Sequence, residues 1–101
     1  MKYRKMGRTG LMVSEFCLGT MTFGNQVDET GSLKLIDQAM DAGVNFIDTA
    51  DLYVDGLTEK ILSKAIKGRR SAVVLASKIG AWQTRLRQTP LMQSLGERQL
   101  Y

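Results

Sequence analysis

The sequence lacks the features that would stabilise an extracellular protein or anchor one in a membrane. It contains one cysteine among 101 residues, so a disulfide and a cysteine-ligated metal are both excluded within a single chain. No stretch approaches the roughly 18 consecutive apolar residues of a membrane span, and the basic first ten residues have no apolar core like that of a signal peptide. We therefore expect a cytoplasmic protein without a metal site, with Cys17, inside the apolar segment EFCLG, as a buried and reduced thiol.

Strong charge of one sign is also absent. The net charge is +4, and the basic residues form no stripe along the chain. Neither nucleic acid nor a membrane surface is therefore predicted as a partner. With 44% hydrophobic and 24% charged residues, the composition is typical of a soluble globular chain of one domain.

Three short segments, residues 14–19, 44–48 and 71–78, have the pattern of buried strands. Each is apolar on both faces, as strands in a parallel sheet are. The hairpin-like segment 3–14 precedes them, with a turn that contains glycine. We expect this hairpin to lie outside the repeat that follows.

The two segments between the strands predict helices. Residues 28–43 begin with acidic side chains and end at Gly43, a residue typical of a C-terminal cap. Residues 57–68 open at Thr58, the expected N-cap, and stop at Gly68. The inward faces are predicted to be Leu33, Ile36 and Met40 in the first helix, and Ile61, Leu62, Ala65 and Ile66 in the second.

The predicted strands end at regular intervals. Gly19, Asp48 and Lys78 are 29 and 30 residues apart, which is the length of one βα unit. A doubly wound sheet and a (β/α)8 barrel both consist of such units, and the spacing alone does not separate them. The dinucleotide motif G-x-G-x-x-G does not follow the first strand, and residues 19–24 lack the lysine and hydroxyl of a P-loop.

Chemically useful side chains follow these strand ends. In a barrel all C-terminal strand ends lie on one face, so Asp48, Tyr53 and Lys78 would meet there, beside Gly19 and Thr20. An ammonium next to a phenol stabilises the anion that forms when the phenol gives up its proton. A carboxylate would hold that ammonium in place. Such a trio could protonate a carbonyl oxygen while hydride reaches the carbon.

Four stretches, RKMGRTGLMVSEFCLGTMTFG, AGVNFIDTADLY, GLTEKIL and VVLASKIG, resemble the N-terminal part of the aldo-keto reductases in order and spacing. The resemblance covers residues 1–80. It implies an α/β fold, namely the opening hairpin and about three βα units of a (β/α)8 TIM barrel. It also implies reduction of aldehydes and ketones with NADPH. The spelling around Tyr53 is most similar to the branch with bacterial general reductases and potassium-channel beta subunits.

The resemblance implies roles for individual residues. Asp48, Tyr53 and Lys78 match three of the four catalytic residues of the family, with Tyr53 as the proton donor. Asp51 matches no catalytic residue and is interpreted as a loop residue or local cap. The residues that match contacts to the cofactor around its nicotinamide ribose are Gly19, Thr20, Met21 and Asp48.

The fourth catalytic residue of the family is a histidine, and this chain has none. Another interval of 30 residues would place the next strand end near position 108, so we interpret the absence as missing chain rather than substitution. Residues 81–101 depart from the family pattern and are treated as a separate tail. A truncated gene, a change of reading frame near residue 80 and a deliberately shortened chain all stay open.

Two functions are consistent with these observations. The first is a fragment of an NADPH-dependent carbonyl reductase that acts on a small carbonyl substrate and is inactive alone. The second is a non-catalytic relative, either a regulatory or cofactor-sensing subunit or a vestigial fragment kept for interaction. An incomplete barrel leaves open sheet edges, which predicts self-association.

Overall fold

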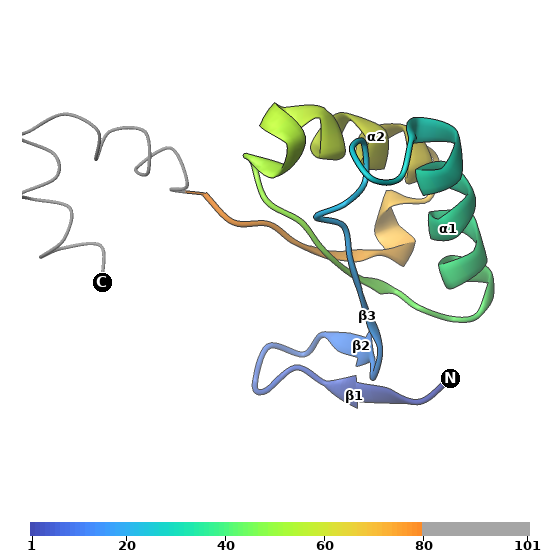
Figure 1. Ribbon diagram of the computed structural model, residues 1–101. Helices are drawn as coiled ribbons and strands as arrows, with labels where there is room; N and C mark the ends of the chain where they lie inside the picture. The colour runs from blue at the N-terminus through green and yellow to red at the C-terminus, as the bar shows by residue number, and fades with distance from the viewer. Residues whose placement is uncertain (80–101) are drawn as a thin grey trace, which may run out of the picture.

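The computed structural model describes residues 1–79, which form a hairpin followed by a strand–helix–strand–helix–strand unit (Figure 1). The elements are β1 Tyr3–Lys5, β2 Met12–Ser14, β3 Cys17–Gly19, α1 Glu29–Asp41, β4 Phe46–Asp48, α2 Leu57–Ala65 and β5 Val74–Ala76. Strands β3, β4 and β5 form one parallel sheet in that order. The predicted element order and parallel pairing are confirmed. Within residues 1–79 the sheet has three strands and does not close into a barrel.

The hairpin is a separate two-stranded sheet. Strands β1 and β2 pair antiparallel, with Tyr3 opposite Ser14. The turn contains Gly7 and Gly10 at φ +54° and +78°, a region in which glycine meets no steric penalty. The hairpin lies beyond the N-terminal end of β3 (Figure 1), away from the strand ends that carry the candidate site.

The first predicted strand, residues 14–19, is wrong in its extent. Ser14 belongs to the hairpin, and β3 begins only at Cys17. Between them the chain bends, because the Ser14 hydroxyl donates to the carbonyl of Phe16 at 2.6 Å. The apolar run in the sequence therefore covers two strands of different sheets.

The third predicted strand, residues 71–78, is also too long. A 3₁₀ turn, Arg70–Ala72, occupies its beginning, and the Arg70 guanidinium donates to the Val73 carbonyl at 2.8 Å. The paired strand β5 ends at Ala76, two residues before Lys78.

Helix α1 ends where the sequence predicted. The Asp28 carboxylate accepts a hydrogen bond from the Gly31 N–H at 2.7 Å and caps the N-terminus. Gly43 has φ +98°, and its N–H donates to the Met40 carbonyl at 2.9 Å, as in a glycine-terminated helix.

Neither helix in residues 1–79 has the length and apolarity needed to cross a membrane.

Thr58 is not the N-cap of α2, contrary to the sequence prediction. The helix begins at Leu57, and Gly56, at φ +91°, holds the cap position without a side-chain hydrogen bond. The Thr58 side chain is fully buried and donates to the Phe23 carbonyl at 2.7 Å. Thr58 therefore fastens α2 to the loop that follows β3.

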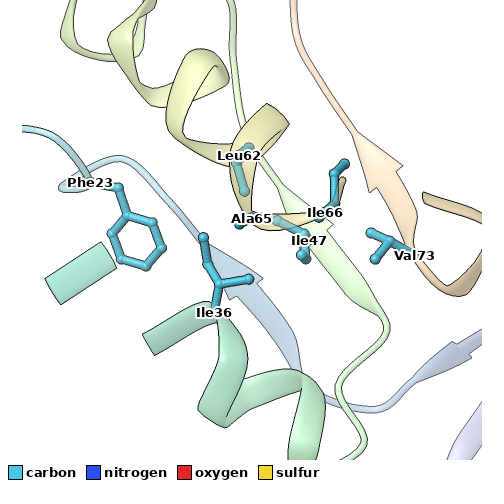
Figure 2. Packing of buried hydrophobic residues seen from close by; sticks show 7 residues of the cluster. All are labelled: Phe23, Ile36, Ile47, Leu62, Ala65, Ile66 and Val73. Carbon is cyan, nitrogen blue, oxygen red and sulfur yellow. The ribbon is translucent and has the colours of Figure 1, made fainter. Parts of the chain in front are cut away.

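The core lies between the two helices and one face of the parallel sheet (Figure 2). Ile36 of α1 and Ile47 of β4 are both fully buried at its centre. The predicted inward faces of both helices are confirmed, with Leu33 and Met40 partly buried against the cluster. The members are Phe23, Ile36, Ile47, Leu62, Ala65, Ile66 and Val73.

The two faces of the sheet differ in how they are covered. Leu18, Ile47 and Leu75, which share one row of the register, pack toward the helices. The preceding row alternates to the opposite face, which no helix of residues 1–79 covers. On that face Cys17 is exposed, so the prediction of a buried thiol is wrong.

Asn45 fastens the hairpin to the sheet. Its side-chain oxygen accepts from the Ser14 N–H at 2.7 Å, and its amide nitrogen donates to the Met12 carbonyl at 2.9 Å. Its own carbonyl accepts from the Val74 N–H at 2.7 Å. One side chain just before β4 therefore satisfies two backbone groups of β2.

We expect Asn45→Ala to lower the free energy of unfolding by about 1–2 kcal/mol, because two backbone groups of β2 lose their partner. The measurement is urea unfolding followed by circular dichroism. The matched control is Asn25→Ala, at an exposed asparagine in the loop after β3. Equal unfolding midpoints for the two variants would contradict the fastening role.

Candidate active site

The candidate site begins with one row of the sheet register. Asp48, the last residue of β4, lies between Gly19 of β3 and Ala76 of β5. Both neighbours are small, and a Cβ added to Gly19 would meet no atom within 4 Å. The Asp48 side chain is 36% exposed. The register therefore gives this carboxylate open space on the face without helices.

Lys78 returns to this carboxylate from beyond the end of β5. The Asp51 N–H donates to the Lys78 carbonyl at 3.0 Å, so the chain still follows its neighbour after the strand has ended. The ammonium donates to Asp48 Oδ2 at 2.7 Å and to the Thr49 carbonyl at 3.1 Å. The prediction that Asp48 and Lys78 lie at the same end of the sheet is confirmed.

Tyr53 completes the group from the loop after β4. Its hydroxyl accepts from Lys78 Nζ at 3.3 Å, and the ammonium lies 5.3 Å from the centre of the ring. The next two residues, Val54 and Asp55, adopt φ of +50° and +53°. Such values are costly for a β-branched residue, by about 1–3 kcal/mol. The loop that places Tyr53 at the site is therefore strained at Val54, the residue directly after it.

The electrostatics follow from these contacts. The hydrogen bond to Asp48 raises the pKa of the Lys78 ammonium, desolvation lowers it by less, and the hydrogen bond to Tyr53 adds a smaller increase. Cys17 lies on the same open face, and partial burial together with the Asp48 charge raises the pKa of its thiol, against a smaller opposite effect of Lys78. The contacts within residues 1–79 therefore favour the charged form of Lys78.

The residues predicted to contact a cofactor surround the same strand ends. Gly19 and Met21 are exposed, and the Met21 side chain is 65% exposed. Thr20 is fully buried, and its hydroxyl donates to the Asp48 carbonyl at 3.0 Å. The Thr20 side chain therefore fixes β3 to β4, and its role toward a cofactor stays a prediction.

Two further contacts and one buried oxygen without a partner were not predicted from the sequence. The Thr49 carbonyl accepts from Lys78, and no side-chain signal could reveal a backbone acceptor. Ser77, directly before Lys78, donates to Glu59 Oε2 of α2 at 3.2 Å. Asp51 lies in the loop, as interpreted, and one of its carboxylate oxygens is buried without a partner in residues 1–79.

A model of the aldo/keto reductase family matches residues 15–99 of this chain. The chain belongs to the aldo/keto reductase family. The matched range extends past residue 80. The predicted boundary between residues 1–80 and the tail, residues 81–101, stays a prediction.

Relatives and solved structures of the aldo/keto reductase family cover most of this chain. An uncharacterised oxidoreductase of Bacillus subtilis, YrpG, is 49% identical over an alignment of 86 residues, and the match covers 78% of this chain and 26% of the relative. A probable voltage-gated potassium channel subunit beta of Oryza sativa is 42% identical, over 78% of this chain and 25% of its own length. The holo form of the aldo-keto reductase AKR11C1 from Bacillus halodurans matches with a TM-score of 0.74 and 45% identity, over 79% of this chain and 26% of that one.

The chain thus spans about a quarter of the length of these relatives. Their partial coverage agrees with a fold that consists of the hairpin and the first βα units of a TIM barrel. The family membership and the predicted fold class are confirmed.

We expect nuclear magnetic resonance titration of the Lys78 Nζ signals to give a pKa above the ordinary lysine value, and Asp48→Asn to lower it. Because the folded-state pKa is raised, the stabilising contribution of Lys78 is complete below the unfolded-state pKa and is lost as the pH rises through the folded-state value. Lys78→Gln should therefore lower the unfolding midpoint at neutral pH but not in strong alkali. A pKa for Lys78 that Asp48→Asn leaves unchanged would contradict the assigned ion pair.

Proposed function

We propose that residues 1–79 carry the N-terminal part of the active site of an NADPH-dependent oxidoreductase that reduces aldehydes or ketones to alcohols. One observation carries the proposal: a single ammonium, Lys78 Nζ, donates to both the Asp48 carboxylate and the Tyr53 hydroxyl. A carbonyl reduction requires a proton donor for the oxygen. The contact with the Lys78 ammonium makes the Tyr53 hydroxyl a better proton donor.

Each of the three side chains has a distinct task. The Tyr53 hydroxyl accepts from Lys78, so its own hydrogen is directed elsewhere, toward the oxygen of a substrate carbonyl. When that proton leaves, the adjacent ammonium stabilises the phenolate. Asp48 holds the ammonium at 2.7 Å and keeps it from turning into solvent. NADPH, when bound, supplies the hydride that adds to the carbonyl carbon.

The residues around Asp48 fit the nicotinamide end of such a cofactor. Gly19 and Ala76 flank Asp48 in the register and leave space beside a partly exposed carboxylate that can accept from a ribose hydroxyl. Met21, two residues after Gly19 in the chain, is exposed. These features support binding of a flat ring and a sugar at the open face.

The second candidate is a cofactor-sensing subunit without turnover. It is supported by the plant relatives named as potassium channel beta subunits, which are 42% and 40% identical to this chain. Such a subunit would bind NADPH through the same residues. Binding of NADPH by the full-length chimera described below, without oxidation of NADPH, would favour this candidate over the reductase.

For the 101-residue chain alone we expect no oxidation of NADPH above that of its own Tyr53→Phe variant. Residues 1–79 supply three strands of the parallel sheet, whereas closure of the family barrel takes eight, so a substrate and a cofactor are not enclosed beside Asp48, Tyr53 and Lys78. The measurement is NADPH absorbance with a panel of aldehydes. Turnover well above the variant would show that this part suffices for catalysis.

In a full-length chimera we expect Tyr53-dependent turnover. Residues 1–79 replace the matching segment of the Bacillus halodurans aldo-keto reductase, and Tyr53→Phe then lowers kcat/KM by about 10²–10⁴, the usual effect of a lost general acid. Tyr3→Phe, which removes a phenol hydroxyl from the hairpin, is the matched control. A chimera that loses no more activity with Tyr53→Phe than with Tyr3→Phe would refute the assigned proton donor.

A further inference from the structure

The first turn of α2 contacts segments that follow the parallel strands. The Leu57 N–H donates to the carbonyl of Tyr53, in the loop after β4. The buried hydroxyl of the next residue, Thr58, donates to the Phe23 carbonyl, in the loop after β3, at 2.7 Å. This turn is therefore fixed to two of the three strand ends that form the candidate site.

The segment after the third strand, β5, is held by Glu59. Its Oε2 accepts a hydrogen bond from the Ser77 hydroxyl at 3.2 Å, and Ser77 directly precedes Lys78. The position of Glu59 in the first turn suits a carboxylate, because the helix dipole favours negative charge there. Three consecutive residues of α2 therefore hold the segments after β3, β4 and β5.

Side chains 77 and 78 point to opposite sides of the sheet. Beyond the end of β5 the chain still follows its neighbour, since the Asp51 N–H donates to the Lys78 carbonyl at 3.0 Å. Successive side chains of an extended segment alternate, so Ser77 reaches Glu59 on α2 while Lys78 reaches Asp48 on the open face. A rotation of this segment about its own axis would break both contacts. The bond to Glu59 thus fixes the direction in which the Lys78 side chain leaves the backbone.

This direction matters because little else confines the Lys78 side chain. The side chain is 55% exposed, and its ammonium lies 3.3 Å from the Tyr53 hydroxyl, a distance at which a small displacement loses the hydrogen bond. The groups that raise the pKa of this ammonium within residues 1–79 are Asp48 and Tyr53, not Glu59. Glu59 therefore affects Lys78 through the backbone rather than through its charge.

We propose that Glu59 is a positioning residue for proton transfer, which accepts from Ser77 and thereby directs Lys78 toward Asp48 and Tyr53. The inference rests on the proposed function, because it assigns Tyr53 as the proton donor that Lys78 assists. It adds a residue of α2 that contacts none of these three side chains but determines whether they meet.

The kinetic test uses the full-length chimera described above. Glu59→Ala is expected to lower kcat at least about tenfold with KM unchanged, because a small misplacement of a reacting group is costly. Glu59→Gln keeps an acceptor oxygen and should retain most of kcat. The matched control, Glu29→Ala, removes the first-turn acid of α1 and its ion pair with Lys64, and should leave kcat unchanged. Equal kcat for Glu59→Ala and Glu29→Ala, or equal losses for Glu59→Ala and Glu59→Gln, would overturn the proposal.

Ser77→Ala removes the other partner of the same hydrogen bond. It should lower kcat as much as Glu59→Ala, and the double variant should lose no more than either single variant, because all three lack one shared interaction. Losses that multiply in the double variant would show independent effects and refute the assigned contact. Fluorescence titration measures NADPH binding, and a variant that loses binding together with kcat would indicate a structural role instead.

Nuclear magnetic resonance titration of the Lys78 Nζ signals in the same chimera separates this inference from the proposed function, since it needs neither cofactor nor turnover. Glu59→Ala should reduce the upward shift of the Lys78 pKa, because the ammonium leaves Asp48 and Tyr53. Glu59→Gln removes the same charge and should retain the shift. Identical titration in both variants would refute the positioning role whatever the kinetics. A shift lost only in Glu59→Ala, in a chimera without Tyr53-dependent turnover, would overturn the proposed function alone.

Discussion

The parallel pairing of β4 with β3 on one side and β5 on the other is the constraint on which the rest of this structure depends. Parallel strands point their carboxyl ends in one direction, so residues after all three strands meet at a single edge. The register then fixes which residues share a row. It sets Asp48 between Gly19 and Ala76, and it thereby gives one carboxylate two small neighbours and free space. A shift by one residue would turn Asp48 toward the helices and into the core.

The same pairing divides the sheet into two faces with different tasks. Ile47 and its row neighbours face the helices and belong to the core, whereas Asp48 and Cys17 face away from them. Burial against helices stabilises the first face through about 25 cal/mol for each Å² of apolar surface removed from water. The second face can then carry a carboxylate and an ammonium that both stay partly exposed, so their ion pair costs less desolvation than a buried pair would.

Sequence reasoning was most successful where the periodicity of the fold decided the outcome. The interval from Asp48 to Lys78 equals one βα unit, and this interval predicts both residues at the same edge of the sheet. It failed where the decision depended on what covers a surface. The apolar neighbours of Cys17 predict a strand, but they do not say which face of that strand a helix will cover. Thr58 has the residue type of an N-cap, yet Gly56, in the left-handed conformation, holds the cap position. The Thr58 hydroxyl is therefore free to donate to the Phe23 carbonyl. Tyr53 is a loop residue and follows no period, but its place just after the strand that ends at Asp48 predicted it at this edge, and the family resemblance named it as the proton donor.

Lys78 connects the candidate site to the packing of α2. It lies two residues beyond β5, where the sheet ladder no longer determines its position. Its backbone is held by Asp51, and the residue before it is bonded to Glu59 at the start of α2. Any shift of α2 would therefore move the segment from which the ammonium reaches Asp48 and Tyr53.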